Sequence, residues 1–390
     1  MVLKRNRREE QAVSITEDEI LGQQRPGNLR PVPPNSDPAG SDAAMDAELE
    51  VLEEQESEAE SYVPRISLKD RLFDIKTLAG FAVSIAIVIF FVLTIKIDFG
   101  VIWTNISKVQ PLWLVAAFVV YYAAFLARGY RWRLLLNSAG FQKEKNVQIP
   151  KIPTLIEIIF LSWFVNCLVP AKLGDAYRGY LLKKNANASF SRTLGTIFAE
   201  RIADVLVLFG LLCLGGLVAF SSVESKISDI SLVFVFGLIL VGAIIAGLVA
   251  LRSASHYIER IIPARFRTMF HRFQQGTVSS FHRNTQLKLY GYTMIIWLCE
   301  GARLYCVLQG LNINLGLSVI VFIALASSLL TTIPFTPAGL GAVEGTMVFV
   351  LTTFGVEKNL AGSVAILDRV ISYWSIILFG AILYIFSKKK

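Results

Sequence analysis

Histidine and cysteine are scarce, and their placement argues against the metal chemistry that they usually support. The 390 residues include three histidines and four cysteines. The histidines lie in one basic stretch, apart from any group of carboxylates. The cysteines fall in apolar segments without the spacing of a zinc site, so we expect small buried hydrophobes. No metal and no other cofactor is therefore predicted. These residues are His256, His271, His282, Cys167, Cys213, Cys299 and Cys306.

Charged residues are also few, at 17% of the chain, whereas hydrophobic residues make up 54% and the mean hydropathy is +0.55. Several apolar runs reach the roughly 20 residues that cross a bilayer. The formal net charge of +8 comes from lysines and arginines spread through the loops between these runs, as the positive bias of cytoplasmic loops predicts. We therefore expect an all-α polytopic membrane protein and no nucleic-acid partner.

Long apolar runs are missing from residues 1–64, which are predicted to form a disordered cytosolic tail. From Asp42 to Glu60 this tail carries nine carboxylates and no basic residue. Low hydrophobicity and like-charge repulsion oppose a packed core. The length and polarity of the tail are not those of a signal peptide. It is either a partner-docking arm or a plain solvated tail, and a membrane domain is predicted over 65–390.

Six apolar segments are predicted to cross the membrane fully. Basic residues precede the first and follow the last, which places both termini in the cytoplasm. Arg128, Arg131 and Arg133 are interpreted as the cytoplasmic end of the second segment, where they anchor the topology or touch anionic headgroups. The basic linker 252–288 is expected to form amphipathic helices at the inner surface. The six segments are 78–95, 111–126 with a helix continuing to 136, 192–220, 230–251, 289–308 and 360–386.

A seventh apolar run, residues 154–170, is predicted to enter the membrane and turn back. A full crossing would put the basic residues of 172–192 outside the cell, against the charge bias. A re-entrant segment that turns between Asn166 and Gly174, with Pro170 and Gly174 in the break, removes this conflict.

The run 315–333 meets a second break, at Pro334, Pro337, Gly339 and Gly341. The prolines stop a helix, and the glycines permit the dihedrals of a restart that carries Glu344 on its first turns. At membrane depth such a break exposes free N–H groups and a positive helix end. We interpret 315–354 as a second re-entrant hairpin, entered from the opposite side, in a pattern that resembles an inverted repeat. Eight conventional spans would also place both termini inside.

Ionisable residues occur in four places within apolar sequence, where burial in a bilayer is costly. Asp175 and Arg178 are spaced to pair on one helical face, and Arg201 is spaced to bridge to Asp204 with one acid left over. The clusters either lock helices together or line a functional polar cavity. The candidate residues are Asn166, Lys172, Asp175 and Arg178; Glu200, Arg201 and Asp204; Glu344; and Asp368 and Arg369, the last two expected to pair with other helices.

The ordered motifs resemble a known family. They are Asn166-x3-Pro170-x-Lys172-x-Gly174-Asp175-x2-Arg178, Glu200-Arg201-x2-Asp204, Pro334-x2-Pro337-x-Gly339-x-Gly341-x2-Glu344, and Asp368-Arg369. Over roughly residues 75–386 they are similar to the lysylphosphatidylglycerol synthase transmembrane family, also called flippase-like. The resemblance implies a membrane domain that moves aminoacylated phospholipid between leaflets in the bifunctional synthases. Other members serve glycolipid, polyprenyl-linked sugar or hopanoid pathways. The soluble transferase domain is not recognised here, so lysyl transfer is not expected.

The expected function is a lipid flippase of the cell membrane. Arg178, Arg201 and Arg369 are expected to hold a phosphate with the helix start at 339–341, while the carboxylates balance them, receive a cationic headgroup or carry protons. The expected partners are membrane lipids, either anionic phospholipid or polyprenyl phosphate, with a pathway enzyme or a second copy left open. Two other classes stay open: an enzyme on a lipid-linked substrate that uses Glu200 or Asp204 as general base, and a scaffold that recruits a glycosyltransferase.

Overall fold

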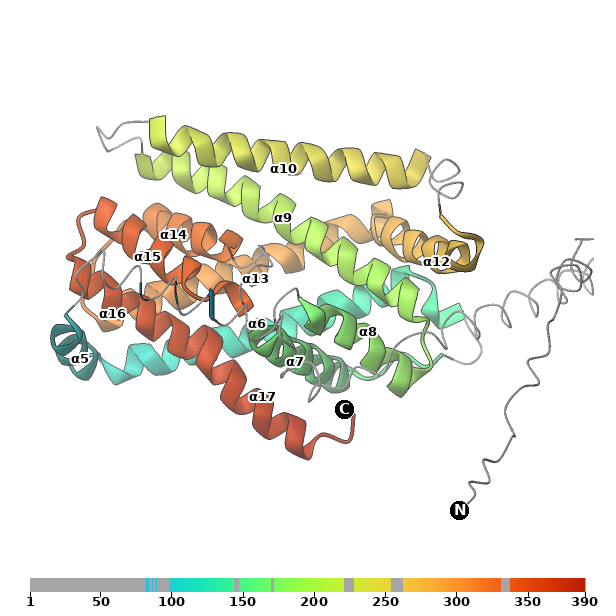
Figure 1. Cartoon of the computed structure of the whole chain (residues 1–390), viewed down its shortest axis with the longest axis horizontal. Coiled ribbons are helices and arrows are strands. Elements are labelled where there is room, and N and C mark those ends of the chain that lie inside the picture. Colours follow the sequence, from blue (N-terminus) through green and yellow to red (C-terminus); the bar gives the residue numbers. More distant parts are fainter. Residues whose placement is uncertain are drawn as a thin grey trace, which may run out of the picture. The chain divides into compact units, whose positions relative to one another are not determined.

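The computed structural model describes residues 82, 83, 86, 89, 98–143, 147–169, 172–220, 228–253, 262–330 and 337–389, all within one compact unit, 55–390. Regular secondary structure in these ranges is helical (Figure 1). The predicted tail 1–64, and all but four positions of the predicted first span, lie outside the described residues. Pro170 and Pro334 do so as well.

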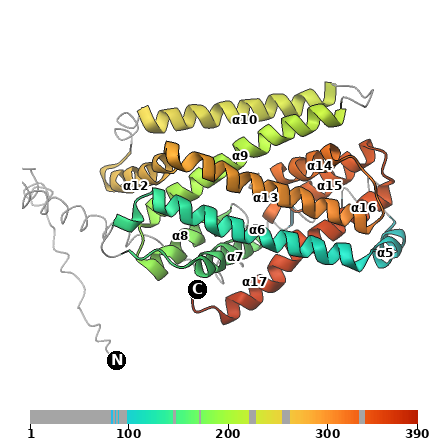
Figure 2. The same cartoon turned by 180° about the vertical axis from the view of Figure 1, so that it is seen from behind.

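Two long antiparallel helices form the centre of the unit, after a short helix α5 (Phe99–Ser107). Helix α6 (Pro111–Ser138) packs along α13 (Arg283–Gly310), as Figure 2 shows. At one end the Gln110 side-chain amide donates to Asn312 at 2.9 Å, and at the other the hydroxyls of Ser138 and Thr285 lie 2.8 Å apart. The start of one helix therefore meets the end of the other. The predicted helices at 111–136 and 289–308 are confirmed and are longer than expected.

The first predicted break is a helical hairpin. Helix α7 (Ile152–Leu168) ends at Val169 in extended backbone, and α8 (Leu173–Ala186) packs back against it. Lys172, just before α8, has left-handed backbone with φ of 53°. The Gly174 amide donates to the Asn166 side-chain oxygen at 2.8 Å. A Cβ on Gly174 would stand 2.0 Å from the Ser162 carbonyl oxygen, so only glycine allows the two arms to approach this closely.

The second predicted break is also a hairpin, between α14 (Leu317–Leu330) and α15 (Ala342–Thr353). Before α15 the chain makes a short turn with left-handed Ala338, at φ of 47°, and with Gly341 at φ of 87°. The Gly341 amide donates to the Glu344 carboxylate at 2.6 Å, which caps the start of α15. The predicted helix restart with Glu344 in its first turn is confirmed.

The remaining helices pack against one side of this pair, which lies behind them in Figure 1 and in front of them in Figure 2. Helix α9 (Phe190–Phe220) contacts α8, α12 (Ala264–Ser280) and α14, and α10 (Ser228–Ser253) contacts α9 and α12. Gly195 and Gly276 bring α9 and α12 into backbone contact, so α12, within the predicted linker 252–288, is docked on α9. The chain then passes through α16 (Lys358–Arg369), a π-helical turn (Val370–Trp374) and α17 (Ser375–Phe386). The predicted helices at 192–220, 230–251 and 360–386 are confirmed.

Apolar side chains lie on both the inside and the outside of the unit. Tyr121, Phe125 and Phe164 belong to a core shared by α6, α7 and α17. Outward-facing residues such as Leu112 and Phe349 are largely exposed, an arrangement suited to lipid contact. Among the described residues, Pro111–Ser138 and Lys358–Phe386 are long and apolar enough to cross a membrane, whereas Ile152–Leu168 and Leu317–Leu329 are shorter apolar helices. The all-α polytopic class predicted from composition agrees with this architecture.

Candidate functional site

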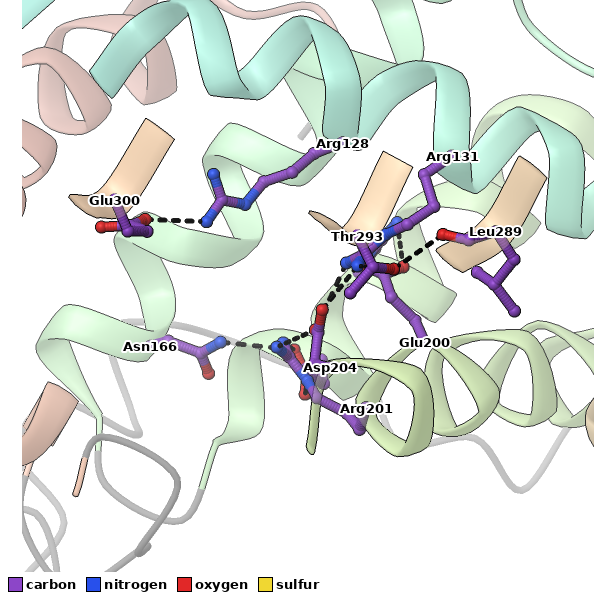
Figure 3. A network of polar contacts seen from close by, with 11 residues as sticks. Arg128, Arg131, Asn166, Glu200, Arg201, Asp204, Leu289, Thr293 and Glu300 are labelled. Carbon is purple, nitrogen blue, oxygen red and sulfur yellow. Dashed lines mark hydrogen bonds and ion pairs between the residues drawn. The ribbon is translucent and has the colours of Figure 1, made fainter. Parts of the chain in front are cut away.

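The adjacent residues Glu200 and Arg201 on α9 form the first ionic cluster with α6 and α8. Arg201 grips Asp175 through two donors, Nε to Oδ2 at 3.0 Å and Nη2 to Oδ1 at 2.8 Å. Glu200 accepts from Arg131 Nη2 at 2.6 Å. Asp204, one turn after Glu200 on the same face of α9, accepts from Arg131 Nη1 at 2.5 Å. One arginine of α6 thus holds two carboxylates of α9, as Figure 3 shows.

Arg178 gives Glu200 a second cationic partner. Its Nη2 lies 3.0 Å from Glu200 Oε2, an ion pair without hydrogen-bond geometry. The Arg178 guanidinium also stacks 3.9 Å from the centre of the Trp132 ring. Arginine tolerates this burial because its planar, weakly hydrated cation can stack and pair at the same time.

The adjacent residues Asp368 and Arg369 on α16 form the second cluster. Asp368 lies 3.2 Å from Arg303 on α13. Arg369 donates to Glu344 on α15 at 2.8 Å. It also donates to the carbonyl oxygens of Ala338 and Gly339, each at 3.3 Å, and so holds the turn of the second hairpin. Asp368 and Arg369 pair with other helices and not with each other, as predicted.

The two clusters repeat the same plan. In each, the acid of an acid–arginine pair contacts an arginine of a long central helix, Arg131 on α6 or Arg303 on α13. The arginine of that pair contacts the acid in the first turn of the second hairpin arm, Asp175 or Glu344. Because α6 and α13 are antiparallel, the helices that carry Arg131 and Arg303 run in opposite directions. This arrangement is what the inverted repeat predicted from the sequence would require, and the repeat itself stays a prediction.

One further pair joins the two halves. Arg128 on α6 donates to Glu300 Oε1 on α13 at 3.0 Å, and Arg303 approaches Glu300 Oε2 at 3.1 Å. The Arg128 guanidinium also lies 4.5 Å from the centre of the Trp163 ring. Arg128 is 5% exposed and Arg131 1% exposed, so these are interior charges that depend on their partners.

The clusters and both hairpin breaks surround one cavity of about 440 Å³. Apolar side chains from α9, α10, α13 and α15, among them Leu208, Ile244, Ile296 and Met347, complete its wall. Within the described residues, ten charged side chains line it: Arg128, Arg131, Lys172, Glu200, Arg201, Asp204, Glu300, Arg303, Asp368 and Arg369.

The comparison with protein families agrees with this architecture. A family model described as the lysylphosphatidylglycerol synthase TM region matches residues 77–380. The chain belongs to this family. It is therefore a multi-pass protein of the cell membrane, and the predicted family is confirmed.

Individual relatives of this family member come from archaea, and two of the three described here are named membrane proteins. A UPF0104 membrane protein of Methanocaldococcus jannaschii is 38% identical over 221 residues, which cover 57% of this chain and 93% of that protein. A UPF0104 membrane protein of Pyrococcus horikoshii is 27% identical over 318 residues, 74% of this chain and 92% of that protein. The glycosyltransferase AglD of Haloferax volcanii is 25% identical over 315 residues, 72% of this chain and 49% of that protein. These relatives support a function connected with membrane lipids.

The structure brings the described candidate residues of this family member into one region. The expected pair of Asp175 with Arg178 does not form, because the Asp175 carboxylate faces Arg201 and Arg178 faces Glu200. The bridge from Arg201 to Asp204 is present but long, at 3.8 Å. Asp175, Arg178 and Glu344 stand behind the cavity wall and hold residues that line it. Asn166, Lys172, Glu200, Arg201, Asp204, Asp368 and Arg369 line the cavity, and Gly174, Pro337, Gly339 and Gly341 shape the breaks.

The interpretation of Arg128 and Arg131 as membrane-surface anchors is wrong. Both are buried in ion pairs, and only Arg133 of that group is exposed. Sequence reasoning also missed Glu300 and Arg303. The signal was present as two ionisable residues three positions apart, on one face of an apolar helix, in each of the segments that became α6 and α13.

Proposed function

We propose that this protein moves a lipid with an anionic headgroup between the two leaflets, with the headgroup in the cavity and the acyl or prenyl chains in the bilayer. The observation that carries the proposal is the cavity itself, whose wall combines ten charged side chains of the described residues with apolar ones. Ionisable groups within the membrane are costly, and those that persist usually serve ion or substrate paths. Arginine donors suit a phosphate, and the carboxylates keep the empty cavity close to neutral.

The lengths of the hairpin arms support a site near the middle of the membrane. Helices α7 and α14 have 17 and 14 residues. At 1.5 Å per residue they extend about 25 and 21 Å, less than the roughly 30 Å of the hydrocarbon core. In this proposal each hairpin enters and leaves on the same side, and six other segments cross fully. Non-helical backbone at this depth is tolerated where it borders a wet cavity.

The repeated ionic plan supports alternating access as the mechanism. Each half has its own hairpin, its own acid–arginine pair and its own long helix, and the Arg128 to Glu300 contact joins the halves. A movement of one half against the other would open the cavity first to one leaflet and then to the other. The energy source does not follow from this arrangement.

The test is dithionite quenching of fluorescent phospholipids and polyprenyl phosphates in proteoliposomes. We expect quenching beyond half of the label with the wild type. Arg201→Ala and Glu344→Ala should quench close to half, because each removes one partner of a hairpin ion pair, while Arg133→Ala, an exposed control, should behave as the wild type. Wild-type rates in both hairpin variants, at equal protein level and folding, would contradict the proposal.

A membrane enzyme acting on a lipid-linked substrate is the second candidate, favoured by the relative that is named a glycosyltransferase. This chain spans about half of that relative. Product formation by pure protein in detergent, where no leaflets exist, would favour the enzyme. Transport without product formation would favour the flippase.

A further inference from the structure

The cavity contains buried donors that the protein leaves unused. Arg128 and Arg303 both approach Glu300, each through Nη2. Of the remaining donors, Arg128 Nη1 and Arg303 Nε and Nη1 are buried and have no hydrogen-bond partner in the described part of the chain. The same is true of Trp297 Nε1, Ser327 Oγ and Ser372 Oγ. All five residues line the one cavity, and we call these six atoms the unpartnered donors.

Arg201 and Arg369, which bind the acid of each hairpin, differ from Arg128 and Arg303 in this respect. Arg201 uses Nε and Nη2 on Asp175, and Arg369 uses Nε on Glu344 and Nη2 on two carbonyl oxygens. Their main donors are thus engaged within the protein. The unpartnered donors come instead from α6, α13, α14 and the π-helical turn, at the contact between the halves.

The chemistry of the unpartnered donors defines what they would bind. Nearly all buried polar groups in native proteins have a partner in the protein, in water or in a ligand, so several buried donors around one cavity form a place where a ligand can supply the acceptors. Arginine and the tryptophan indole can donate but cannot accept. Two guanidinium groups that share one carboxylate also match the several oxygens of a phosphate group. Two buried acceptors at the cavity, Glu200 Oε2 and Asp368 Oδ1, also lack a hydrogen-bond partner, but each faces an arginine at 3.0 or 3.2 Å. The unmet groups without a counter-charge are thus donors, and they suit an oxyanion.

The charge of the site limits the charge of that oxyanion. Within the described residues, the cavity-lining groups and their direct ion-pair partners comprise seven cations and six carboxylates. Lys172 is the lining cation to which the structure gives no ion-pair partner among these groups. One negative charge neutralises the set, which matches a phosphodiester better than a phosphomonoester or a diphosphate. The seven are Arg128, Arg131, Lys172, Arg178, Arg201, Arg303 and Arg369; the six are Asp175, Glu200, Asp204, Glu300, Glu344 and Asp368.

We propose that a singly charged phosphodiester binds between Arg128 and Arg303, with Trp297, Ser327 and Ser372 donating to its remaining oxygens. The inference rests on the proposed function and names the position and charge of the group that the cavity receives. A lipid headgroup and a soluble phosphodiester share this chemistry. A ligand in this position contacts both central helices and so both halves of the repeat.

The test uses Trp297→Phe and Ser372→Ala, which remove unpartnered donors and leave every ion pair in place. Thermal unfolding of the purified protein in detergent is measured with and without dihexanoyl phosphatidylglycerol. Without lipid we expect Tm to be unchanged or higher, because each substitution removes an unsatisfied buried donor. With lipid we expect about tenfold weaker binding for each substitution, the value of a hydrogen bond to a charged group. Trp374→Phe, an exposed tryptophan outside the cavity, is the matched control.

The outcomes test the binding site and the proposed transport separately. A lower Tm without lipid and unchanged lipid affinity would give Trp297 and Ser372 a structural role and overturn the inference. Tighter binding of dihexanoyl phosphatidic acid, which carries more negative charge, would overturn the assignment of one charge. Equal binding of glycerophosphoglycerol, which lacks chains, would support the site with a soluble ligand and contradict a lipid source. Donor-dependent lipid binding without flipping in proteoliposomes would leave the site standing and contradict the proposed function.

Discussion

The two ionic clusters share one plan but differ in how firmly each is held. In the first, Glu200 has two arginine partners, and the Arg201 side chain is 31% exposed. In the second, Asp368 contacts Arg303, and the Arg369 side chain is 8% exposed while it binds the carbonyls of the hairpin turn. The first cluster is therefore the more open at its arginine, whereas the second is the more open at its hairpin acid, since Glu344 is 24% exposed and Asp175 17%. In the alternating-access mechanism proposed above, a difference between the two halves would correspond to one of the two conformations.

In the two clusters, the number of ion-pair partners does not follow the exposure of the side chains. The first cluster has the more exposed arginine, yet Glu200, its central acid, has two arginine partners. The second cluster has the more buried arginine, and Asp368, its central acid, depends on a single described arginine. Because an unpaired charge is costly in proportion to its burial, the second cluster should be the more fragile to a single substitution.

The largest effect is therefore expected from Arg303→Leu. This change leaves the buried Asp368 without its described cation, a situation that typically costs about 3–5 kcal/mol. Arg178→Leu is the comparison in the first half, since Glu200 keeps Arg131. We expect Arg178→Leu to lower Tm clearly less than Arg303→Leu. Thermal unfolding in detergent measures both.

The double variant Arg303→Leu with Asp368→Leu provides the control. Removing both charges should recover much of the lost stability, because a buried pair can often be replaced by apolar residues. If Arg178→Leu were as harmful as Arg303→Leu, the remaining Arg131 would not compensate for the loss at Glu200, and the contrast between the clusters would be wrong.

The sequence was sufficient for the long helices predicted at 111–136, 192–220, 230–251, 289–308 and 360–386 and for both breaks, but not for the short helix α5. Apolar runs bounded by basic residues gave the long helices, because a membrane segment must be apolar over a set length. Pro337, Gly339 and Gly341 gave the second break, because proline and glycine act on the backbone locally. The acid–arginine pairs were also recognisable, because a charged residue within an apolar run is unusual even when its partner is not known.

The partners of these charges were not predictable in the same way. Arg131 and Glu200 lie 69 positions apart, and Arg201 and Asp175 lie 26 apart. Such pairs depend on how each helix is rotated and which helix it meets, which local spacing does not encode. The spacing of Asp175 and Arg178 favoured a pair that packing of α8 against α9 replaced. Arg131 was misread because arginine at the end of a span is common, whereas here it faces Glu200 and Asp204 of another helix.

A smaller effect is expected from Gly174→Ala, which tests how the first hairpin is closed. The new Cβ would stand 2.0 Å from the Ser162 carbonyl oxygen and 2.7 Å from the Asn166 side chain. Forcing the arms apart should lower stability by about 1–3 kcal/mol, as overpacking does. It should also slow transport, because Asn166 and Lys172 line the cavity beside this contact. Thermal unfolding and dithionite quenching report the two effects.

Gly210→Ala on α9 is the matched control, because a Cβ there meets nothing within 4 Å. It should leave stability unchanged or raise it by up to about 1 kcal/mol, the helix propensity gained. Equal losses in both glycine variants would mean that the approach of α7 to α8 does not matter for the fold.

The smallest effects are expected at the left-handed residue of each break, Lys172 in the first hairpin and Ala338 in the second. A residue with a side chain is strained in this conformation and glycine is not, so Lys172→Gly and Ala338→Gly should each change stability by no more than about 1 kcal/mol.

Only Lys172→Gly also removes a cation from the cavity. It should weaken the binding of anionic lipid and slow transport, whereas Ala338→Gly should leave both close to wild type. Lys172→Asn separates charge from backbone, because asparagine tolerates this conformation and is neutral. Transport losses in Lys172→Gly and Lys172→Asn, but not in Ala338→Gly, would assign the difference between the hairpins to the charge of Lys172. An equal loss in Ala338→Gly would assign it to the stiffness of the turns, and the two hairpins would then be mechanically equivalent.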